Sequence, residues 1–234
     1  MGKIFGYDSK VMQVLGKLGD LILLNIVFIV CCIPIFTIGA AQAGMYRAAV
    51  ALQDPESDYT WFAAFRMGFK DGFLRITIAW CLLLVAIYLV GINAFSVIYY
   101  EKVFAVEESI LWISIIGAAM LMMIQSVMTL FHSRFGCTFF QLFRNALMLM
   151  LFNFLRCIVV FVLMWLPAVI FLVNAALFIQ ITPLWIMGYY AICAYFIVWV
   201  FRVPFAVLVK NYNETHEIDE PKTEENPEIE EPEE

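Results

Sequence analysis

The sequence predicts an all-α protein that crosses a membrane several times, and two observations support this fold class. The 234 residues are 64% hydrophobic and only 15% charged, whereas soluble domains carry about 25% charged residues. Four long stretches also contain no Asp, Glu, Lys or Arg: residues 21–46, 76–100, 109–133 and 157–201. A bilayer core about 30 Å thick requires roughly 20 apolar residues per helix. Each of the first three stretches is long enough for one crossing, and the fourth is long enough for two.

Taken in order, the stretches predict five spans, near residues 21–46, 74–98, 109–131, 157–178 and 184–206. Pro183 marks the turn between the last two spans. Pro34 and Pro167 fall inside spans, where the backbone groups that a proline leaves unpaired need partners from neighbouring helices or from Thr and Ser side chains. The first stretch has a second interpretation. Because Pro34 interrupts it, this stretch could be a re-entrant hairpin.

The distribution of Lys and Arg predicts the orientation in the cell membrane, because cytoplasmic loops carry an excess of positive charge. If the 47–75 loop, the 132–156 loop and the C-terminus are cytoplasmic, ten of the 14 basic residues lie inside and the N-terminus lies outside. Lys3, Lys10 and Lys17 oppose this arrangement. The hairpin alternative places the N-terminus inside and changes the distribution to thirteen against one.

An internal repeat with an offset of 78 residues favours the five-span arrangement. The offset places residues 38–41 on residues 116–119, and it pairs four residues of the following segment with their equivalents: Thr60, Phe62, Phe65 and Arg66 with Thr138, Phe140, Phe143 and Arg144. Each unit would be one span, an amphipathic cytoplasmic helix and a second span. Such duplications are common in membrane transport folds. Two parallel units require the first and third spans to point the same way, which leaves the N-terminus outside.

The two connecting segments, residues 57–75 and 135–155, are predicted to be interfacial elbow helices. The second is apolar enough to resemble a further span, but Arg144 lies at its centre. An Arg at the middle of the bilayer costs about 2.5–3.5 kcal/mol. At the membrane surface the same side chain can reach the phosphates, so an interfacial helix is favoured.

The C-terminal segment differs in composition from the rest of the chain. Residues 1–210 form the predicted transmembrane domain, whereas residues 211–234 hold eleven acidic side chains and one Lys. We expect this tail to be disordered and cytoplasmic. A docking peptide for a basic partner is the alternative.

The sequence contains no recognisable catalytic motif, no CxxC spacing of cysteines and no ionisable residue in the middle of a span. We therefore expect no enzymatic activity, no cofactor, no metal and no nucleic-acid partner, and the lipid bilayer is the predicted surrounding. A few polar, proline and glycine residues are candidates for helix packing, interhelical hydrogen bonds or a solute pathway. They are Asn25, Pro34, Thr37, Gly39, Arg66, Arg144 and Asn153.

Several of these residues lie in patterns that resemble the YesL family. The patterns are Gly19 to Asn25, Pro34 with Thr37-Ile38-Gly39, the elbow around Phe65-Arg66, Phe143 to Ala146, and Asn153 to Arg156. The family consists of Firmicute-type integral membrane proteins of unassigned function, without established catalytic residues. Its members tend to be encoded beside carbohydrate-uptake transporters and two-component regulators. The resemblance implies an accessory or regulatory role in carbohydrate uptake, with a sugar transporter subunit or a sensor kinase as partner.

The alternative function is a transporter or channel subunit for a small neutral solute such as a sugar. The duplicated plan and the interruption at Pro34 and Gly39 favour it, because transporters are commonly built from repeats with broken helices.

Overall fold

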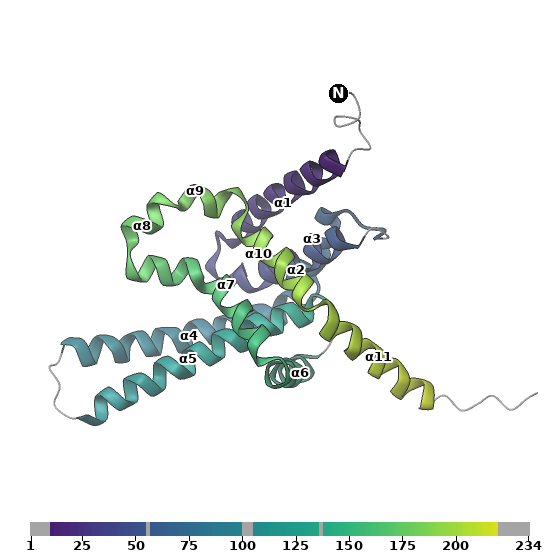
Figure 1. Ribbon diagram of the computed structural model, residues 1–234. Helices are drawn as coiled ribbons and strands as arrows, with labels where there is room; N and C mark the ends of the chain where they lie inside the picture. Colours follow the sequence, from purple (N-terminus) through teal and green to yellow (C-terminus); the bar gives the residue numbers. More distant parts are fainter. Residues whose placement is uncertain (1–9, 55–56, 100–104, 136–137, 220–234) are drawn as a thin grey trace, which may run out of the picture. The chain divides into compact units, whose positions relative to one another are not determined.

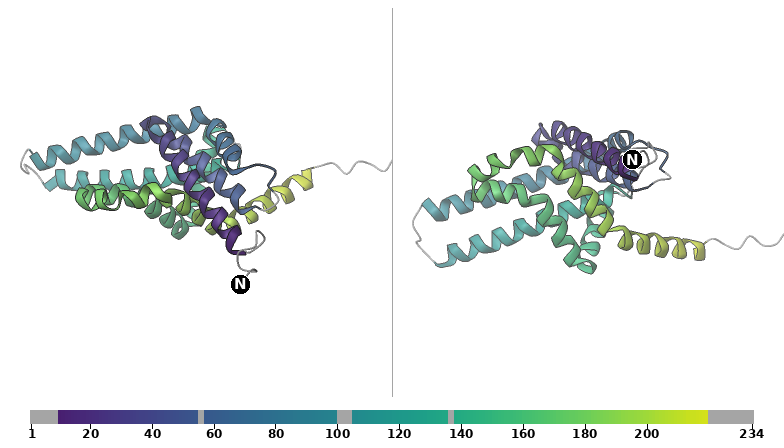
Figure 2. Two further views of the ribbon diagram at one scale, coloured as in Figure 1. Left: turned by 90° about the horizontal axis from the view of Figure 1, so that it is seen from above. Right: turned by 45° about the horizontal axis from the view of Figure 1, so that its top comes forward.

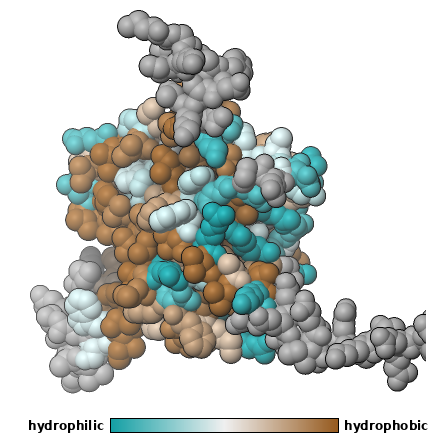
Figure 3. All heavy atoms as spheres, turned by 45° about the vertical axis from the view of Figure 1, so that its right-hand side comes forward, coloured by the Kyte–Doolittle hydropathy of each residue, from teal (hydrophilic) through white to brown (hydrophobic). Residues whose placement is uncertain are grey.

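The computed structural model describes residues 10–54, 57–99, 105–135 and 138–219, and every regular element among them is helical (Figure 1). Six segments are long and apolar enough to cross a membrane: Val14–Cys32, Ile35–Gln53, Phe73–Ser96, Ser109–His132, Phe154–Val173 and Thr182–Val200. On the face drawn in Figure 3, hydrophobic residues cover a continuous area and hydrophilic residues gather on one side. The all-α fold class is therefore confirmed, and the helices have the composition of a multi-pass membrane protein.

The chain divides into two units, residues 1–200 and residues 201–234. The second unit contains helix α11, Arg202–Asp219. The tail predicted to be disordered from residue 211 is thus helical as far as Asp219, and the rest of the tail lies outside the described residues.

The first apolar stretch forms two helices instead of the predicted single span. Helix α1 covers Lys10–Cys32, a 3₁₀ turn η1 covers Ile35–Thr37, and helix α2 covers Ile38–Gln53 and packs against α1. Pro34 adopts extended backbone with φ −77° and ψ 114°. Its missing N–H and the restriction on the preceding residue end α1. The stretch 21–46 is therefore not one continuous helix: Pro34 divides it into two helices, each within a segment long and apolar enough to cross a membrane.

Helix α2 lies at the centre of the first unit, in contact with α1, α3, α4, α5 and α10. The short helix α3, Trp61–Lys70, begins at Thr60, whose Oγ1 accepts a hydrogen bond from the N–H of Ala63 at 3.3 Å. Glycines allow α2 and α3 to approach closely. A Cβ on Gly44 would lie 2.8 Å from the carbonyl oxygen of Phe65, and one on Gly68 would lie 3.0 Å from that of Ala43.

Four longer helices follow α3. Helix α4 covers Phe73–Tyr99, α5 covers Ala105–His132, α6 covers Phe139–Phe152 and α7 covers Phe154–Val173. Helices α4 and α5 lie side by side (Figures 1 and 2). The first residues of α3 and α6, Trp61 and Phe139, are separated by the offset of 78 residues found in the sequence. The two predicted elbow segments are therefore helices that begin at equivalent positions, after Thr60 and Thr138.

The last part of the first unit is interrupted. After α7 come the short helices α8, Ala175–Gln180, and α9, Thr182–Leu184, then a π-helical segment η2, Trp185–Tyr189, and α10, Tyr190–Val200. Gly188 has non-helical backbone inside η2. The predicted turn at Pro183 thus lies in the short α9, and the last predicted span corresponds to α9, η2 and α10.

Candidate functional site

A cavity of about 430 Å³ lies between α1, η1, α2, α4, α7 and the first residue of α10. Ligand pockets in proteins typically have volumes of about 300–1,000 Å³ and mostly apolar walls. None of the lining residues is charged: they are Phe28, Ile29, Cys32, Ile35, Ile38, Gln42, Trp80, Leu84, Ile87, Met164, Trp165, Ala168 and Tyr190.

The cavity has a buried floor and an exposed rim. Phe28, Gln42 and Trp80 keep 4%, 7% and 4% of their surface accessible, whereas Ile35 at the rim keeps 64%. Ala168 is also exposed. The cavity is therefore open to the surface beside Ile35 and Ala168.

Aromatic rings form much of the wall. Trp80 of α4 stacks on Trp165 of α7 with ring centroids 6.0 Å apart, and Phe28 of α1 meets Tyr190 of α10 at 5.2 Å. Both indole N–H groups already have partners, since Nε1 of Trp80 donates to the carbonyl of Ile35 at 2.7 Å and Nε1 of Trp165 donates to Oγ of Ser126 at 3.2 Å. The rings thus offer flat apolar surfaces to a ligand.

Gln42 provides a polar group inside this wall. Its Oε1 is buried and has no hydrogen-bond partner. A buried acceptor without a partner costs about 1–3 kcal/mol. A ligand with one hydroxyl or N–H donor would remove that cost.

Three interruptions of the helices surround the cavity, and the first is the Pro34 turn. The hydroxyl of Thr37 lies 2.6 Å from the carbonyl oxygen of Cys31 and 2.7 Å from that of Pro34, so it can donate to either. Together with the Trp80 indole on Ile35, it supplies donors to backbone carbonyls around the break. Thr37 is therefore a structural partner of the Pro34 turn.

The second interruption is at η2, and Asn25 of α1 stabilises it. Asn25 is fully buried. Its Nδ2 donates to the carbonyls of Trp185 at 2.9 Å and Ile186 at 2.8 Å, and its Oδ1 accepts from the N–H of Ala191 at 3.1 Å. All three bonds go to backbone groups on either side of the non-helical Gly188. One amide therefore replaces the helical hydrogen bonds lost at this break and joins α1 to α10.

The third interruption is Pro167 in α7. A proline removes the donor to the carbonyl four residues earlier, which here belongs to Leu163. The hydroxyl of Tyr189 donates to that carbonyl at 2.8 Å. A neighbouring element thus satisfies this break too, as the sequence predicts.

The backbone groups described at these breaks are hydrogen-bonded to protein side chains. They are therefore not available to a ligand in the cavity. Its lining is mostly aromatic and aliphatic, with the amide of Gln42, the thiol of Cys32 and the hydroxyl of Tyr190 as polar groups. Such a site fits a neutral and largely apolar ligand.

The remaining predicted residues are dispersed. Gly39 borders the cavity region, because a Cβ there would lie 3.0 Å from Cβ of Trp80. Arg66 on α3 and Arg144 on α6 are exposed. Asn153 lies between α6 and α7, where its Oδ1 accepts from Nη1 of Arg156 at 2.8 Å. The structure thus brings Pro34, Thr37 and Gly39 together, with Asn25 further along α1.

Sequence reasoning missed a polar junction at the other end of α2. Nη1 of Arg47 lies 2.6 Å from Oδ2 of Asp71, and Nε2 of the buried His132 contacts the Asp71 carbonyl. Gly72 has φ +77° and lies against the His132 ring, where a Cβ would clash. Among the described residues no group of three His, Cys, Asp or Glu side chains could hold a metal ion. The junction therefore has a structural role, joining α2, α4 and α5.

Comparison with known families adds one match. Residues 21–94, which include most of α1, all of α2 and α3, and most of α4, match the model of a family described as "Protein of unknown function, DUF624". No curated protein and no protein of known structure matches the chain. The fold and the matched segment define the class: a multi-helix protein of the membrane type, with part of the chain similar to a family of unknown function.

Proposed function

We propose that the protein is a non-enzymatic accessory or regulatory component of carbohydrate uptake, with a cavity that binds a neutral, largely apolar ligand. The cavity supports the second part of this proposal, because it combines aromatic walls with one buried and unpaired acceptor, Gln42 Oε1. The link to carbohydrate uptake rests on the resemblance to the YesL family. A sugar transporter subunit or a sensor kinase is the proposed partner.

The proposal includes an orientation in which the N-terminus is cytoplasmic. Nε1 of Trp61 on α3 donates to Oδ1 of Asp20 on α1 at 3.1 Å, so Asp20 lies at the same level as the elbow helix. From Asp20 to Cys32 the helix rises only about 18 Å, which is less than the bilayer core of about 30 Å. The turn exposes Ile33, Ile35 and Phe36 by 75%, 64% and 52%. A re-entrant hairpin, open to the cytoplasm, fits both observations.

The internal repeat is compatible with this orientation. The aligned residues begin at Ile38, which is the first residue of α2. The two units are then α2–α3–α4 and α5–α6–α7, and α1 belongs to neither. In a re-entrant hairpin α2 returns toward the cytoplasm, in the same direction as α5. The parallel repeat therefore does not require the N-terminus to lie outside.

Transport of a small neutral solute is the second candidate function. The interrupted helices around one cavity favour it, since transporters use broken helices at their substrate sites. The lining argues against a free sugar as cargo. Each buried hydroxyl of a sugar needs a hydrogen-bond partner, and at the breaks these partners are already engaged. We therefore favour the accessory role.

The accessory role is tested by deleting the gene and by capturing the tagged full-length protein from native membranes. We expect slower uptake of a carbohydrate in the deletion strain, and recovery of a transporter subunit or sensor kinase with the captured protein. Normal uptake of every carbohydrate tested, with the protein recovered alone, would contradict the role. Flux of a sugar into proteoliposomes that contain only this protein would instead support transport.

The cavity is tested in the same strain with a substitution that fills it. Ala168→Phe places a ring at the rim, and Ala176→Phe on α8 is the matched control, because Ala176 is exposed and does not line the cavity. We expect Ala168→Phe, but not Ala176→Phe, to reproduce the uptake defect of the deletion at normal protein levels. Full complementation by Ala168→Phe would show that the cavity is not used.

A further inference from the structure

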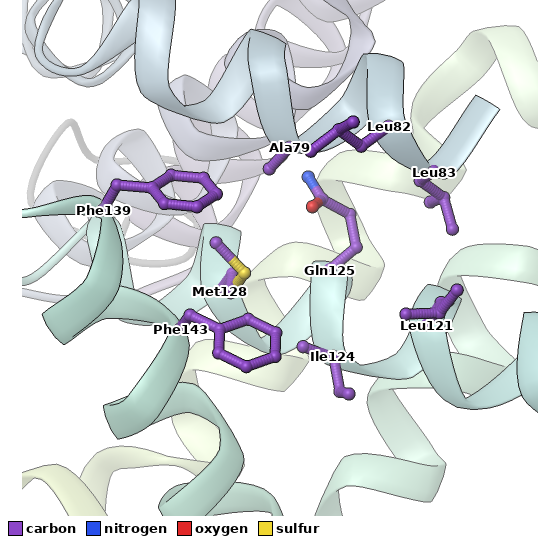
Figure 4. Close-up of a pocket in the computed structure, with 9 residues that line it drawn as sticks. All are labelled: Ala79, Leu82, Leu83, Leu121, Ile124, Gln125, Met128, Phe139 and Phe143. Atoms are coloured by element: carbon purple, nitrogen blue, oxygen red, sulfur yellow. The ribbon is translucent and has the colours of Figure 1, made fainter. Parts of the chain in front are cut away.

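A second pocket lies between α4, α5 and α6 (Figure 4). Its volume is about 160 Å³, and eight of its nine lining residues are apolar. This volume is below the range of about 300–1,000 Å³ that is typical of sites for whole small molecules. The pocket has room for part of an acyl chain.

Gln125 of α5 is the polar exception in this pocket. Its side chain extends from α5 toward Ala79 and Leu82 of α4 (Figure 4). Gln125 keeps 4% of its surface accessible, and its Nε2 has no hydrogen-bond partner. The pocket thus holds a donor in need of an acceptor.

Water is a poor candidate for that acceptor. A buried water molecule needs two to four polar partners, and apolar cavities stay dry. Here the lining offers a single polar side chain. An acceptor attached to an apolar chain satisfies Gln125 and fills the apolar space as well.

The pocket is open on the surface of these helices. Leu82, Leu121 and Phe143 line it and keep 61%, 43% and 41% of their surface accessible. Exposed leucines and phenylalanines of this kind face lipid in a membrane protein. A lipid can therefore enter from the side.

The depth of Gln125 matches the ester groups of a phospholipid. Gln125 lies seven residues before His132, the last residue of α5, which corresponds to a rise of about 10 Å. The headgroup region on each side of a bilayer is roughly 5–8 Å thick. With the end of α5 at the cytoplasmic surface, as in the proposed orientation, the amide lies just below the headgroups.

A positive charge lies on the helix that closes the pocket. Phe139 and Phe143 of α6 line it, and the next residue, Arg144, is exposed. An Arg side chain at this level extends its guanidinium toward phosphate groups and can hold one by paired hydrogen bonds.

We propose that this pocket binds an anionic phospholipid of the inner leaflet. Part of one acyl chain occupies the pocket, the ester carbonyl of that chain accepts a hydrogen bond from Gln125 Nε2, and the lipid headgroup lies at Arg144. The site is separate from the cavity at Pro34, so it can fail or hold independently of the proposed ligand site.

The test measures the phospholipid retained by the full-length protein in detergent, by native mass spectrometry, with phosphatidylglycerol and phosphatidylcholine as probes. Gln125→Met keeps the shape without the donor, and Gln125→Leu is the second variant if the first does not fold. Arg144→Gln removes the charge. The controls are Asn93→Leu, at an exposed position of α4, and Arg66→Gln, at the equivalent position of α3.

We expect the affinity for phosphatidylglycerol to fall about fivefold in Gln125→Met, the effect of one hydrogen bond, and by at least as much in Arg144→Gln. The two controls should bind as the parent does. Three results would each overturn the proposal. The first is equal retention of phosphatidylcholine and phosphatidylglycerol, and the second is unchanged binding by Gln125→Met. The third is complete displacement of the lipid by a free fatty acid, with no effect of Arg144→Gln.

Discussion

At the scale of single residues, a few polar side chains replace the backbone hydrogen bonds that are lost at helix breaks. Asn25, Thr37, Trp80 and Tyr189 all act on backbone carbonyls of a break, and Asn25 also accepts from a backbone N–H. Their side chains are costly to bury in an apolar domain unless they are paired. The pairing at the breaks offsets this cost and allows irregular backbone within an apolar helical domain.

Asn25→Leu should destabilise the protein strongly, because it leaves two carbonyls of η2 and the N–H of Ala191 in α10 without these partners. We expect the free energy of unfolding to fall by about 2–3 kcal/mol, measured by denaturant titration in mixed micelles. Asn93→Leu is the control, since Asn93 is exposed on α4, and it should change stability little. Equal effects of the two substitutions would mean that the three bonds of Asn25 contribute nothing specific.

Thr37 permits a sharper comparison of the same kind. Thr37→Val removes the hydroxyl with little change of shape, so the carbonyls of Cys31 and Pro34 lose that donor. We expect a loss of about 1–2 kcal/mol for Thr37→Val and almost none for Thr37→Ser, in the same titration. If Thr37→Ser is as unstable as Thr37→Val, the methyl group and not the hydroxyl matters.

The sequence identifies Pro34 and Pro167 as places where backbone groups need partners, because the rule involved is local: a proline removes one donor. It identifies Asn25 only as a polar candidate. The partners of Asn25 lie about 160 residues away, and no local pattern announces a non-helical Gly188. The sequence likewise does not place Gln42 and Gln125 in particular pockets, since a pocket is defined by helices distant in sequence.

At the scale of helices, the contact between α2 and α3 depends on two glycines. Gly44→Ala would place a Cβ 2.8 Å from the Phe65 carbonyl oxygen, which is closer than atoms pack without a shift of the helix. We expect a loss of about 1–3 kcal/mol, measured as a lower midpoint of thermal unfolding. Gly117→Ala on α5 is the matched control, because nothing lies within 4 Å of its Cβ position. That substitution should be neutral or stabilising.

The elements show where pattern reasoning succeeds and where it does not. The offset of 78 residues predicts equivalent starts for α3 and α6, because Thr60 and Thr138 precede both helices. The packing partners of the small residues from Gly39 to Gly44 are harder to predict from the sequence. They contact α3 and α4, as the positions of Phe65 and Trp80 show, whereas Gly117 is exposed. Small residues identify a close contact but not its partner.

At the scale of the whole molecule, the orientation is the property most open to a direct test. Single cysteines are introduced into a chain without its native cysteines, at Ser9, Ile33 and Lys102, and are labelled with a membrane-impermeant reagent. We expect Lys102→Cys to react in intact cells and Ser9→Cys to react only after permeabilisation. Ile33→Cys should resist the reagent on both sides if the hairpin is re-entrant. Labelling of Ser9→Cys from outside would restore the five-span arrangement.

The apolar turn at Pro34 has a consequence for biogenesis. No charged residue occurs between Leu21 and Tyr46. In the proposed re-entrant orientation, the α1–α2 pair would therefore partition into hydrocarbon from the ribosomal side without carrying a charged side chain to the far leaflet, which is costly at the bilayer centre.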